Sequence, residues 1–364
     1  MAIGLYIHVP FCRKKCPYCD FYSLPFSKEL ERKYVNSVVK NIDFCKGEVL
    51  DSIYFGGGTP SILSNESYTE IFSAINESFT LVAPEITLEA NPCTVDLEKL
   101  AFLRQVGFNR ISFGVQSCVN SELEKLGRLH NFEQAKSAVL NAKKAGFENI
   151  SCDLMLGIIG QNAETLSYSI NQLSKLPITH ISAYILKIEV ETAYNNPKII
   201  EQLSDEDLVA DLYLQAIDEL SKKGFEQYEI SNFAKKGFEC KHNLKYWHCE
   251  EYLAIGPSAH SFYKGKRCAV PSSVTEFIEN QRQIEVVTEE NPRTFEEVAM
   301  LALRLSEGLS FETCEEFGID FGDLIKKAEP LERAGFVKIS DTGISITKEG
   351  FLISNVIIGK LLFD

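Results

Sequence analysis

The sequence predicts an α/β fold, a partial (β/α)6 TIM-like barrel followed by a smaller C-terminal helical, winged-helix-like domain. Three observations lead to this fold class. Short apolar or β-branched segments alternate with segments of helical period, six times within about 225 residues. Polar residues stand where successive strands end. After about residue 235 the alternation stops and the composition changes.

The six strand–helix units follow one another along the chain. We expect strands at 3–9, 51–58, 85–91, 110–116, 149–157 and 180–186, and helices at 28–42, 66–79, 96–107, 131–146, 163–176 and 205–224. Strands that alternate with helices form a parallel sheet with right-handed crossovers. Six units are too few for a complete eight-fold barrel, so we prefer a partial barrel to the alternative, a doubly wound open sheet.

The chain is expected to divide into three parts. Residues 1–235 form the barrel, 236–290 a connecting region rich in aromatic residues and histidine, and 291–364 the C-terminal domain. In the last part, helices are followed by two strands within 335–350, an order that resembles a winged helix, which often binds DNA. Residues 292–364, however, hold eight Lys or Arg against thirteen Asp or Glu, and the whole chain has a net charge of −14. We therefore expect a structural or docking domain and no nucleic-acid partner.

The composition also indicates in which compartment of the cell the protein is expected. The N-terminus has no basic start followed by a long apolar run, so no signal peptide is expected. No run of about 18 uncharged apolar residues predicts a membrane span. The eleven cysteines are odd in number and scattered, as in a protein kept in a reducing compartment. We expect a cytoplasmic protein without a disulfide framework.

Chemistry in barrels collects on the loops that follow the strands. Here the first strand is followed by a loop with three cysteines, and the second by GGGTP at 56–60. The third strand ends in Glu89 and Asn91, the fourth ends in Gln116, and the fifth carries Asp153. One carboxylate alone could cap a helix or hold a loop. Together on one rim, these residues form a candidate active site.

The loop after the first strand carries Cys12, Cys16 and Cys19. Cys16 follows Cys12 by four residues, and Cys19 follows Cys16 by three. A structural zinc site needs four ligands, usually in two close pairs, and no second pair matches. Three ordinary core cysteines so close in a proline-containing loop would be unusual. Three thiolates can also hold a [4Fe–4S] cluster, in which one iron then lacks a protein ligand. Such an open position is what catalysis or cofactor binding requires.

Cys-x3-Cys-x2-Cys after a strand, with GGGTP after the next strand, resembles the radical S-adenosylmethionine superfamily. The resemblance implies a [4Fe–4S] cluster whose open iron is chelated by S-adenosylmethionine. Over almost the whole chain, LYIHVPFCRKKCPYCDF, YFGGGTPS, EANP, RISFGVQS, LGRLH and GPSAHS look like oxygen-independent coproporphyrinogen III oxidase and its relatives. The C-terminal part looks like the extra domain of that group.

The resemblance also implies cofactor contacts. Tyr6, Gly57 and Glu89 would meet the cluster-bound S-adenosylmethionine. The same pocket would be bordered by Tyr18, Gly58, Thr59, Gln116, Arg128 and Asp153. Chemically, Glu89 can accept from an ammonium or a ribose hydroxyl, and Arg128 can hold a carboxylate in a fork.

Two departures from the oxidase point to a sister group. Phe21 stands where the oxidase has a fourth cysteine, and only eleven residues precede Cys12. Both features are similar to the heme chaperones called HemW, which bind heme and a cluster and hand heme to acceptor proteins. HNLKYW at 242–247 resembles the heme-binding motif of that group, which implies His242 as an axial ligand of heme iron. Without the resemblance, a histidine near Tyr and Trp is usually a packed side chain and not a ligand of iron.

Other candidate ligands of heme iron are His248, Cys249 and His260, although the stretch with His260 is expected at the S-adenosylmethionine pocket. The preferred hypothesis is a heme-trafficking protein whose partners are heme and an acceptor protein, as a monomer or a dimer and with no membrane segment. The second hypothesis is a radical enzyme, either the oxidase or one with another substrate. The third is a zinc-stabilised binding module.

Overall fold

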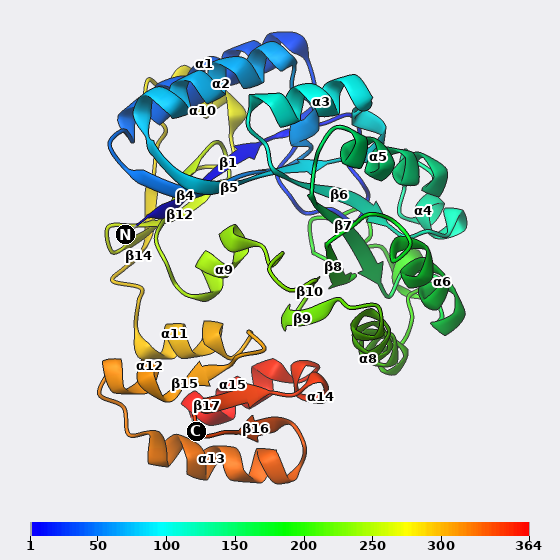
Figure 1. Ribbon diagram of the computed structural model, residues 1–364, viewed down its shortest axis with the longest axis vertical. Coiled ribbons are helices and arrows are strands. Elements are labelled where there is room, and N and C mark those ends of the chain that lie inside the picture. Colours follow the sequence, from blue (N-terminus) through cyan, green and yellow to red (C-terminus); the bar gives the residue numbers. More distant parts are fainter. Residues whose placement is uncertain (1, 364) are drawn as a thin grey trace.

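The computed structural model describes residues 2–363, and its centre is a curved twelve-stranded sheet (Figure 1). Six neighbouring parallel strands are β1 (Ile3–Val9), β4 (Val49–Gly57), β5 (Thr80–Ala90), β6 (Arg110–Gln116), β7 (Asn149–Leu156) and β8 (His180–Ile185). They are the six strands that the sequence predicts. The sheet does not close on itself among the described residues, so the partial barrel is confirmed.

Both edges of the sheet extend further than the alternation indicates. At one edge β11 (Tyr252–Ile255) pairs with β1 as a seventh parallel strand, and three antiparallel strands follow: β12 (His260–Tyr263), β13 (Lys266–Ala269) and β14 (Val286–Glu290). At the other edge, β10 (Asn232–Ala234) pairs antiparallel with β8, and β9 (Glu226–Glu229) pairs antiparallel with β10. Residues 252–290 thus belong to the main sheet.

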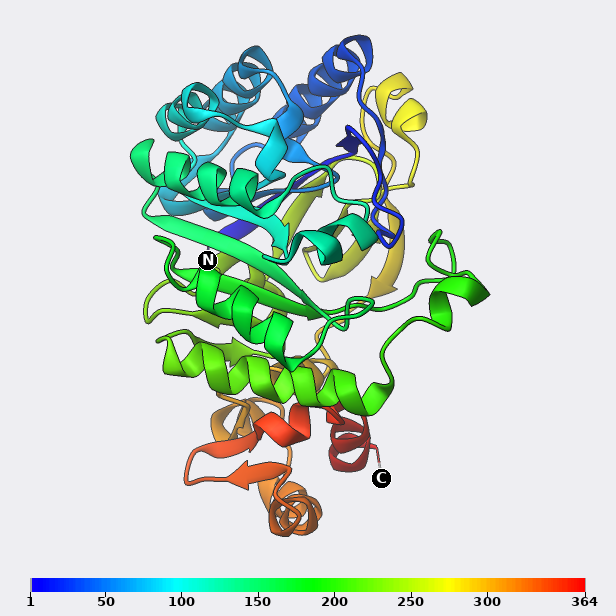
Figure 2. The same ribbon diagram turned by 90° about the vertical axis from the view of Figure 1, so that its right-hand side faces the viewer.

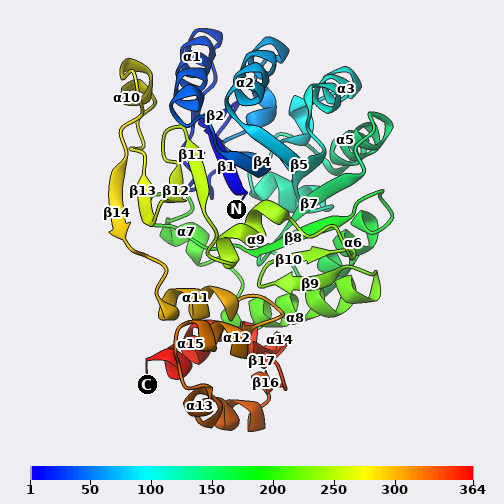
Figure 3. The ribbon, with the colours of Figure 1, turned by 60° about the vertical axis from the view of Figure 1, so that its left-hand side comes forward.

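Helices cover the outer face of the sheet (Figure 3). They are α1 (Lys28–Phe44), α2 (Asn65–Ser78), α3 (Leu97–Val106), α5 (Phe132–Lys144), α6 (Ala163–Leu173) and α8 (Glu206–Lys222). A polar residue caps the N-terminus of each, for example Ser27 for α1 and Asn131 for α5, whose side chains accept from backbone N–H groups. Shorter helices are η1 (Pro60–Ile62), η2 (Pro92–Thr94), α4 (Asn120–Lys125), α7 (Pro197–Ile200) and α10 (Val274–Glu279).

The two faces of the sheet differ in polarity because side chains alternate along a strand. The outward side chains join the apolar core beneath the helices, as Ile53 and Phe55 do on β4. The residues between them, such as Ser52 and Tyr54, face inward. Against this inner face lies α9 (Lys241–Trp247), on the side opposite the outer helices (Figure 3). The interior of the partial barrel is therefore polar, and α9 fills part of it.

The C-terminal part lies below the barrel, next to α8 and α9 (Figure 2). It comprises α11 (Phe295–Ala302), β15 (Leu309–Ser310), α12 (Phe311–Glu316), α13 (Phe321–Arg333), β16 (Val337–Ile339), β17 (Gly343–Ile346), α14 (Lys348–Phe351) and α15 (Ser354–Leu362). The hairpin β16–β17 follows the helices α11, α12 and α13, and β15, which lies between α11 and α12, completes a small sheet of order β15-β17-β16, as in a winged helix. From residue 2 to residue 363, the chain forms no helix with the length and apolarity to cross a membrane.

Candidate functional site

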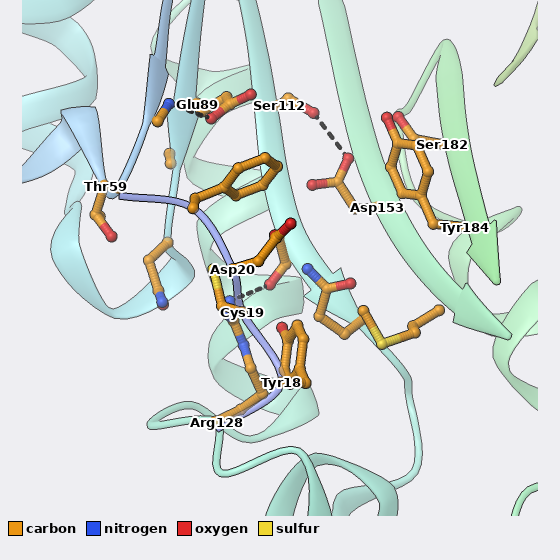
Figure 4. A pocket seen from close by; sticks show the side chains of 18 of the residues that line it. Tyr18, Cys19, Asp20, Thr59, Glu89, Ser112, Arg128, Asp153, Ser182 and Tyr184 are labelled. Atoms are coloured by element: carbon orange, nitrogen blue, oxygen red, sulfur yellow. Dashed lines mark hydrogen bonds between the residues drawn. The ribbon is translucent and has the colours of Figure 1, made fainter. Parts of the chain in front are cut away.

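A cavity of about 390 Å³, here called the rim cavity, lies at the carboxyl ends of the parallel strands (Figure 4). The predicted site residues that line it are Tyr18, Cys19, Gly57, Gly58, Thr59, Glu89, Gln116, Arg128 and Asp153. Its lining does not include Tyr6, Cys12, Cys16, His242 or His260. Phe21, more than half exposed, lies at the cavity beside the cysteine loop.

A pair of short strands that follows β1 holds the cysteine loop in place. β2 (Phe11–Cys12) pairs with β3 (Leu24–Pro25), and the loop between them carries Cys16 and Cys19. The N–H of Cys19 donates to the carbonyl of Cys16 at 3.1 Å. Among residues 2–363 no His, Cys, Asp or Glu side chains converge as ligands of a single metal ion. Cysteines that bind different irons of a cluster need not converge on one point.

The GGG segment approaches the cysteine loop so closely that side chains are excluded. Gly57 has φ +110°, a conformation that L side chains rarely adopt. A Cβ on Gly58 would lie 2.6 Å from the carbonyl oxygen of Phe11, the residue before Cys12. The next residue, Thr59, places its hydroxyl 3.4 Å from the Sγ of Cys12. Glycine here therefore brings the end of β4 against the first cysteine.

Glu89 is a partly buried carboxyl in the rim cavity. It accepts from the Tyr54 hydroxyl at 2.8 Å and from the N–H of Gly57 at 3.2 Å. Burial raises the pKa of Glu89 to about 7, against the opposing effect of the Tyr54 hydrogen bond. The carboxyl can accordingly exchange a proton near neutral pH.

Asp153 and Gln116 lie on neighbouring strands of the same cavity. Asp153 accepts from the Ser112 hydroxyl at 3.1 Å, and burial raises its pKa. Gln116 has φ +72° at the end of β6. Such a conformation in a non-glycine residue costs about 1–3 kcal/mol and is typical of functional sites.

Arg128 connects the cavity to the cysteines. Its guanidinium donates to the Sγ of Cys16 at 3.4 Å and to the carbonyl of Gly114 at 2.6 Å, while its buried Nε has no acceptor. The guanidinium thus connects the cavity wall to the second cysteine of the loop. The unpaired Nε is a donor available to a ligand in the cavity.

His242 lies inside the barrel rather than at the rim. Its Nδ1 is 2.9 Å from the Ser52 hydroxyl, and its Nε2 is 2.8 Å from the Tyr246 hydroxyl. The side chain is fully buried, and burial lowers its pKa to about 3. In this structure neither nitrogen of His242 is free to bind iron.

Comparison with known proteins identifies the family. Residues 6–173 match the Radical SAM superfamily, and residues 293–353 match the HemN C-terminal domain. The chain is 35% identical over 380 aligned residues to the heme chaperone HemW of Bacillus subtilis (strain 168), with 98% of each chain covered. The chain belongs to the HemW family of heme chaperones. HemW of Haemophilus influenzae is 40% identical over 287 residues, covering 76% of this chain and 73% of that one.

A solved structure shows the same fold as this HemW-family chain. Coproporphyrinogen III oxidase (HemN) from Escherichia coli, a radical SAM enzyme, superposes with a TM-score of 0.82 over 99% of this chain and 90% of that one. The two sequences are only 20% identical, so the similarity concerns the fold alone. The Radical SAM match implies a [4Fe–4S] cluster and S-adenosylmethionine, and membership of the HemW family implies heme.

The rim cavity suits such a cofactor chemically. S-adenosylmethionine has a cationic sulfonium and ammonium group, and two partly buried carboxyls, Glu89 and Asp153, line the cavity. It also has a carboxylate, and the free Nε–H of Arg128 is a matching donor. The hydrogen-bonding groups that line the rim cavity of this HemW-family chain therefore fit S-adenosylmethionine.

Sequence reasoning missed several residues of the rim cavity, among them Tyr54, Arg110, Ser112, Ser182 and Tyr184. Most of them come from the middle or the beginning of strands, whereas the prediction relied mainly on the residues where strands end. The alternation of polar and apolar residues in RISFGVQ was a usable signal, because it places Arg110 and Ser112 on the same face as Gln116.

Proposed function

We propose that this chain is a heme chaperone, which binds heme and passes it to an acceptor protein. The observation that carries the proposal is the similarity to HemW over 98% of both chains. Similarity to the oxidase in fold alone is weaker support for a shared function, because one fold hosts many functions. The alternative, a radical oxidoreductase that decarboxylates coproporphyrinogen III, rests on that shared fold and on the rim cavity.

In this proposal Cys12, Cys16 and Cys19 hold the [4Fe–4S] cluster, and the rim cavity takes S-adenosylmethionine. The cluster, when bound, would supply single electrons to the bound cofactor. Glu89 and Asp153 accept hydrogen bonds from the cofactor, and Arg128 donates to its carboxylate. Tyr18, Gly57, Gly58, Thr59 and Gln116 complete the wall.

The finer assignments are also part of the proposal. We assign the chain to the cytoplasm, as a monomer or a dimer, with an acceptor protein that lacks heme. All eleven cysteines are free, which agrees with a reducing compartment.

The test is to prepare the protein without air, reconstitute it with iron and sulfide, titrate it with heme, and assay porphyrinogen conversion on the same sample. We expect stable heme binding, transfer to an apo-hemoprotein, and no porphyrinogen turnover. The variant with Cys12, Cys16 and Cys19 replaced by Ala should lose cluster absorbance. Porphyrinogen turnover that disappears in this variant would instead make the chain an oxidase.

A further inference from the structure

The segment that connects β8 to α8, residues 186–205, is here called the strap. Its first part lies at the rim cavity, because Leu186, Lys187 and Glu189 belong to the lining. Its second part contains the short helix α7. In Figure 2 the strap, in green at the right, lies on the same side of the barrel as the dark-blue cysteine loop. The strap therefore forms one wall of the candidate site.

Most of the strap is exposed to solvent. Of its side chains, only those of Thr192 and Tyr194 are buried, whereas Val190 is 82% exposed. A segment with so few buried contacts opens at a much lower free energy than the core of the barrel. Its position on the cavity therefore depends on the contacts of the few side chains that are buried.

Tyr194 attaches the strap to the cysteine loop. Its backbone N–H donates to the carbonyl of Pro17 at 3.1 Å, and its ring meets the ring of Tyr18 edge-on, with 6.1 Å between the centroids. Its hydroxyl donates to the carbonyl of Lys125 at the end of α4. Pro17 and Tyr18 are the two residues between Cys16 and Cys19. The strap thus holds the turn that carries the second and third cysteines.

The same turn is held from a second side. Gly127, with φ +66°, lies so close that a Cβ there would be 2.9 Å from the Cδ of Pro17. Its neighbour Arg128 donates to the Sγ of Cys16 at 3.4 Å and lies beside Tyr18 (Figure 4). The turn is therefore enclosed between the residues that follow α4 and the strap. A movement of the turn must displace Tyr194 as well.

A metal bound to cysteines fixes the backbone that carries them, because binding and local folding are coupled. If the turn from Cys16 to Cys19 is fixed, its carbonyl and its aromatic ring stay in place for Tyr194. The strap then loses one of its ways of opening. Because a coupling between two sites acts equally in both directions, the attached strap must in turn stabilise the bound metal.

We infer that Tyr194 is a positioning residue of the cysteine loop and couples the strap to the iron–sulfur cluster. With the cluster bound, the strap stays closed on the rim cavity, and without it the strap opens more often. This inference rests on the cluster site of the proposed function, Cys12, Cys16 and Cys19, and adds a segment that responds to occupation of that site.

The first experiment measures hydrogen exchange of the intact protein without air, before and after reconstitution with iron and sulfide. Exchange within 186–205 should become several-fold slower with the cluster, whereas exchange of β9 and β10 should not change. In Tyr194→Ala the cluster should no longer slow the exchange of the strap. Equal exchange of the wild-type strap with and without the cluster would overturn the inference.

The second experiment measures the loss of the cluster to an iron chelator, followed by the cluster absorbance. Tyr194→Ala should lose it about fivefold faster than the wild type, or more, because allosteric couplings are typically of this size. Tyr194→Phe keeps the ring and the backbone N–H and loses only the bond to Lys125. Its rate should lie between those of the wild type and Tyr194→Ala.

Tyr213→Ala is the matched control. Tyr213 on α8 is 3% exposed, as is Tyr194, and its hydroxyl also donates to a backbone carbonyl, that of Ile230 between β9 and β10. Both alanine variants should lose unfolding free energy, because each removes a buried ring. Only Tyr194→Ala should lose the cluster faster. Equal rates in the two variants would show a general loss of stability and would overturn the inference.

The inference and the proposed function can fail separately. If the variant with Cys12, Cys16 and Cys19 replaced by Ala still takes up a cluster, the cluster site of the proposed function is wrong. If these cysteines hold the cluster but the strap and Tyr194→Ala behave like the controls, only the coupling is wrong. Heme binding and porphyrinogen turnover enter neither experiment, so they test the proposed function independently.

Discussion

At the scale of single residues, the contact between Gly58 and Phe11 fixes the geometry of the cysteine loop. Since the Cβ of an alanine at 58 would meet backbone atoms of Phe11, the chain must move there. We expect Gly58→Ala to lower the iron content after reconstitution to less than half of the wild-type value. Iron and sulfide analysis together with the cluster absorbance would measure this.

Gly359 is a suitable control for this variant. It lies in α15 with open space where a Cβ would be. Because alanine is the better helix former by about 1 kcal/mol, Gly359→Ala should slightly raise stability and leave the iron content unchanged. Equal iron content in both variants would show that Gly58 does not position the cysteines.

His130 provides a pH-dependent contribution to stability. Its Nε2–H donates to the carbonyl of Val115 at 3.1 Å, and burial together with the charge of Arg128 lowers its pKa to about 4, from an ordinary value of 6.5. Between these values the unfolded chain binds a proton that the folded chain does not. The stability is therefore complete above pH 6.5 and is lost as the pH falls toward 4.

The matching variant is His130→Gln, which keeps a donor for Val115 but cannot be protonated. Relative to this variant, the wild type should lose about 2 kcal/mol of unfolding free energy between pH 6.5 and 5. Urea unfolding at several pH values would measure the difference. Parallel curves for the two proteins would contradict the pKa shift.

The proximity of residues on neighbouring strands could be predicted from the alternation of strands and helices. Glu89, Gln116 and Asp153 lie in one cavity because parallel strands bring their carboxyl ends together, and alternation along the chain was sufficient to foresee it. The location of His242 could not be foreseen in the same way. Its motif was visible, but whether its imidazole faces a cavity or the sheet depends on how α9 docks, which is a long-range contact.

At the scale of elements, α9 illustrates what local sequence cannot predict. A helix of seven residues is unstable alone and forms because it is docked. Lys245, nearly buried, makes ion pairs with Asp51 at 3.0 Å and Glu250 at 2.8 Å. These contacts, with the bond from His242 to Ser52, attach α9 to β4 and its neighbours.

Lys245→Met keeps most of the side-chain volume but removes the charge. Because both carboxylates are more than a third exposed, we expect a loss of only about 1 kcal/mol of unfolding free energy. Lys241→Met, on the exposed face of the same helix, is the control and should leave the free energy of unfolding unchanged. Urea unfolding of both variants would measure the difference. Equal stability of the two variants would show that the ion pairs of Lys245 do not hold α9 in place.

The strands β11–β14 were likewise not foreseen. Each has only four or five residues, and β11 joins the sheet beside β1, almost 250 residues earlier in the sequence. Short strands whose partners are distant in the sequence show little periodicity, so the sequence pattern does not predict them. The six strand–helix units, in contrast, carry their pattern locally and were predicted within a few residues.

At the scale of the whole molecule, the C-terminal part is attached at the edge of the sheet that β9 forms. The N–H of Ile230 donates to the carbonyl of Arg304, and that of Ser306 to the carbonyl of Tyr228, each at 3.0 Å. Glu229 lies between them and forms an antiparallel bridge with Leu305. The sequence predicted a docking domain and its helix–hairpin order, but no local pattern could indicate where it docks.

This attachment predicts that the backbone hydrogen bond of Ser306 holds the C-terminal part on the barrel. Ser306→Pro removes the N–H that donates to Tyr228 and also the hydroxyl that donates to Gln227, whereas Ser306→Ala removes only the hydroxyl. With the proline, hydrogen exchange in 295–353 should become several-fold faster while the exchange of β4–β7 stays unchanged, because the C-terminal part then opens without the barrel. Ser306→Ala should exchange like the wild type in both regions. Equal exchange in the two variants would show that other contacts hold the C-terminal part on the barrel.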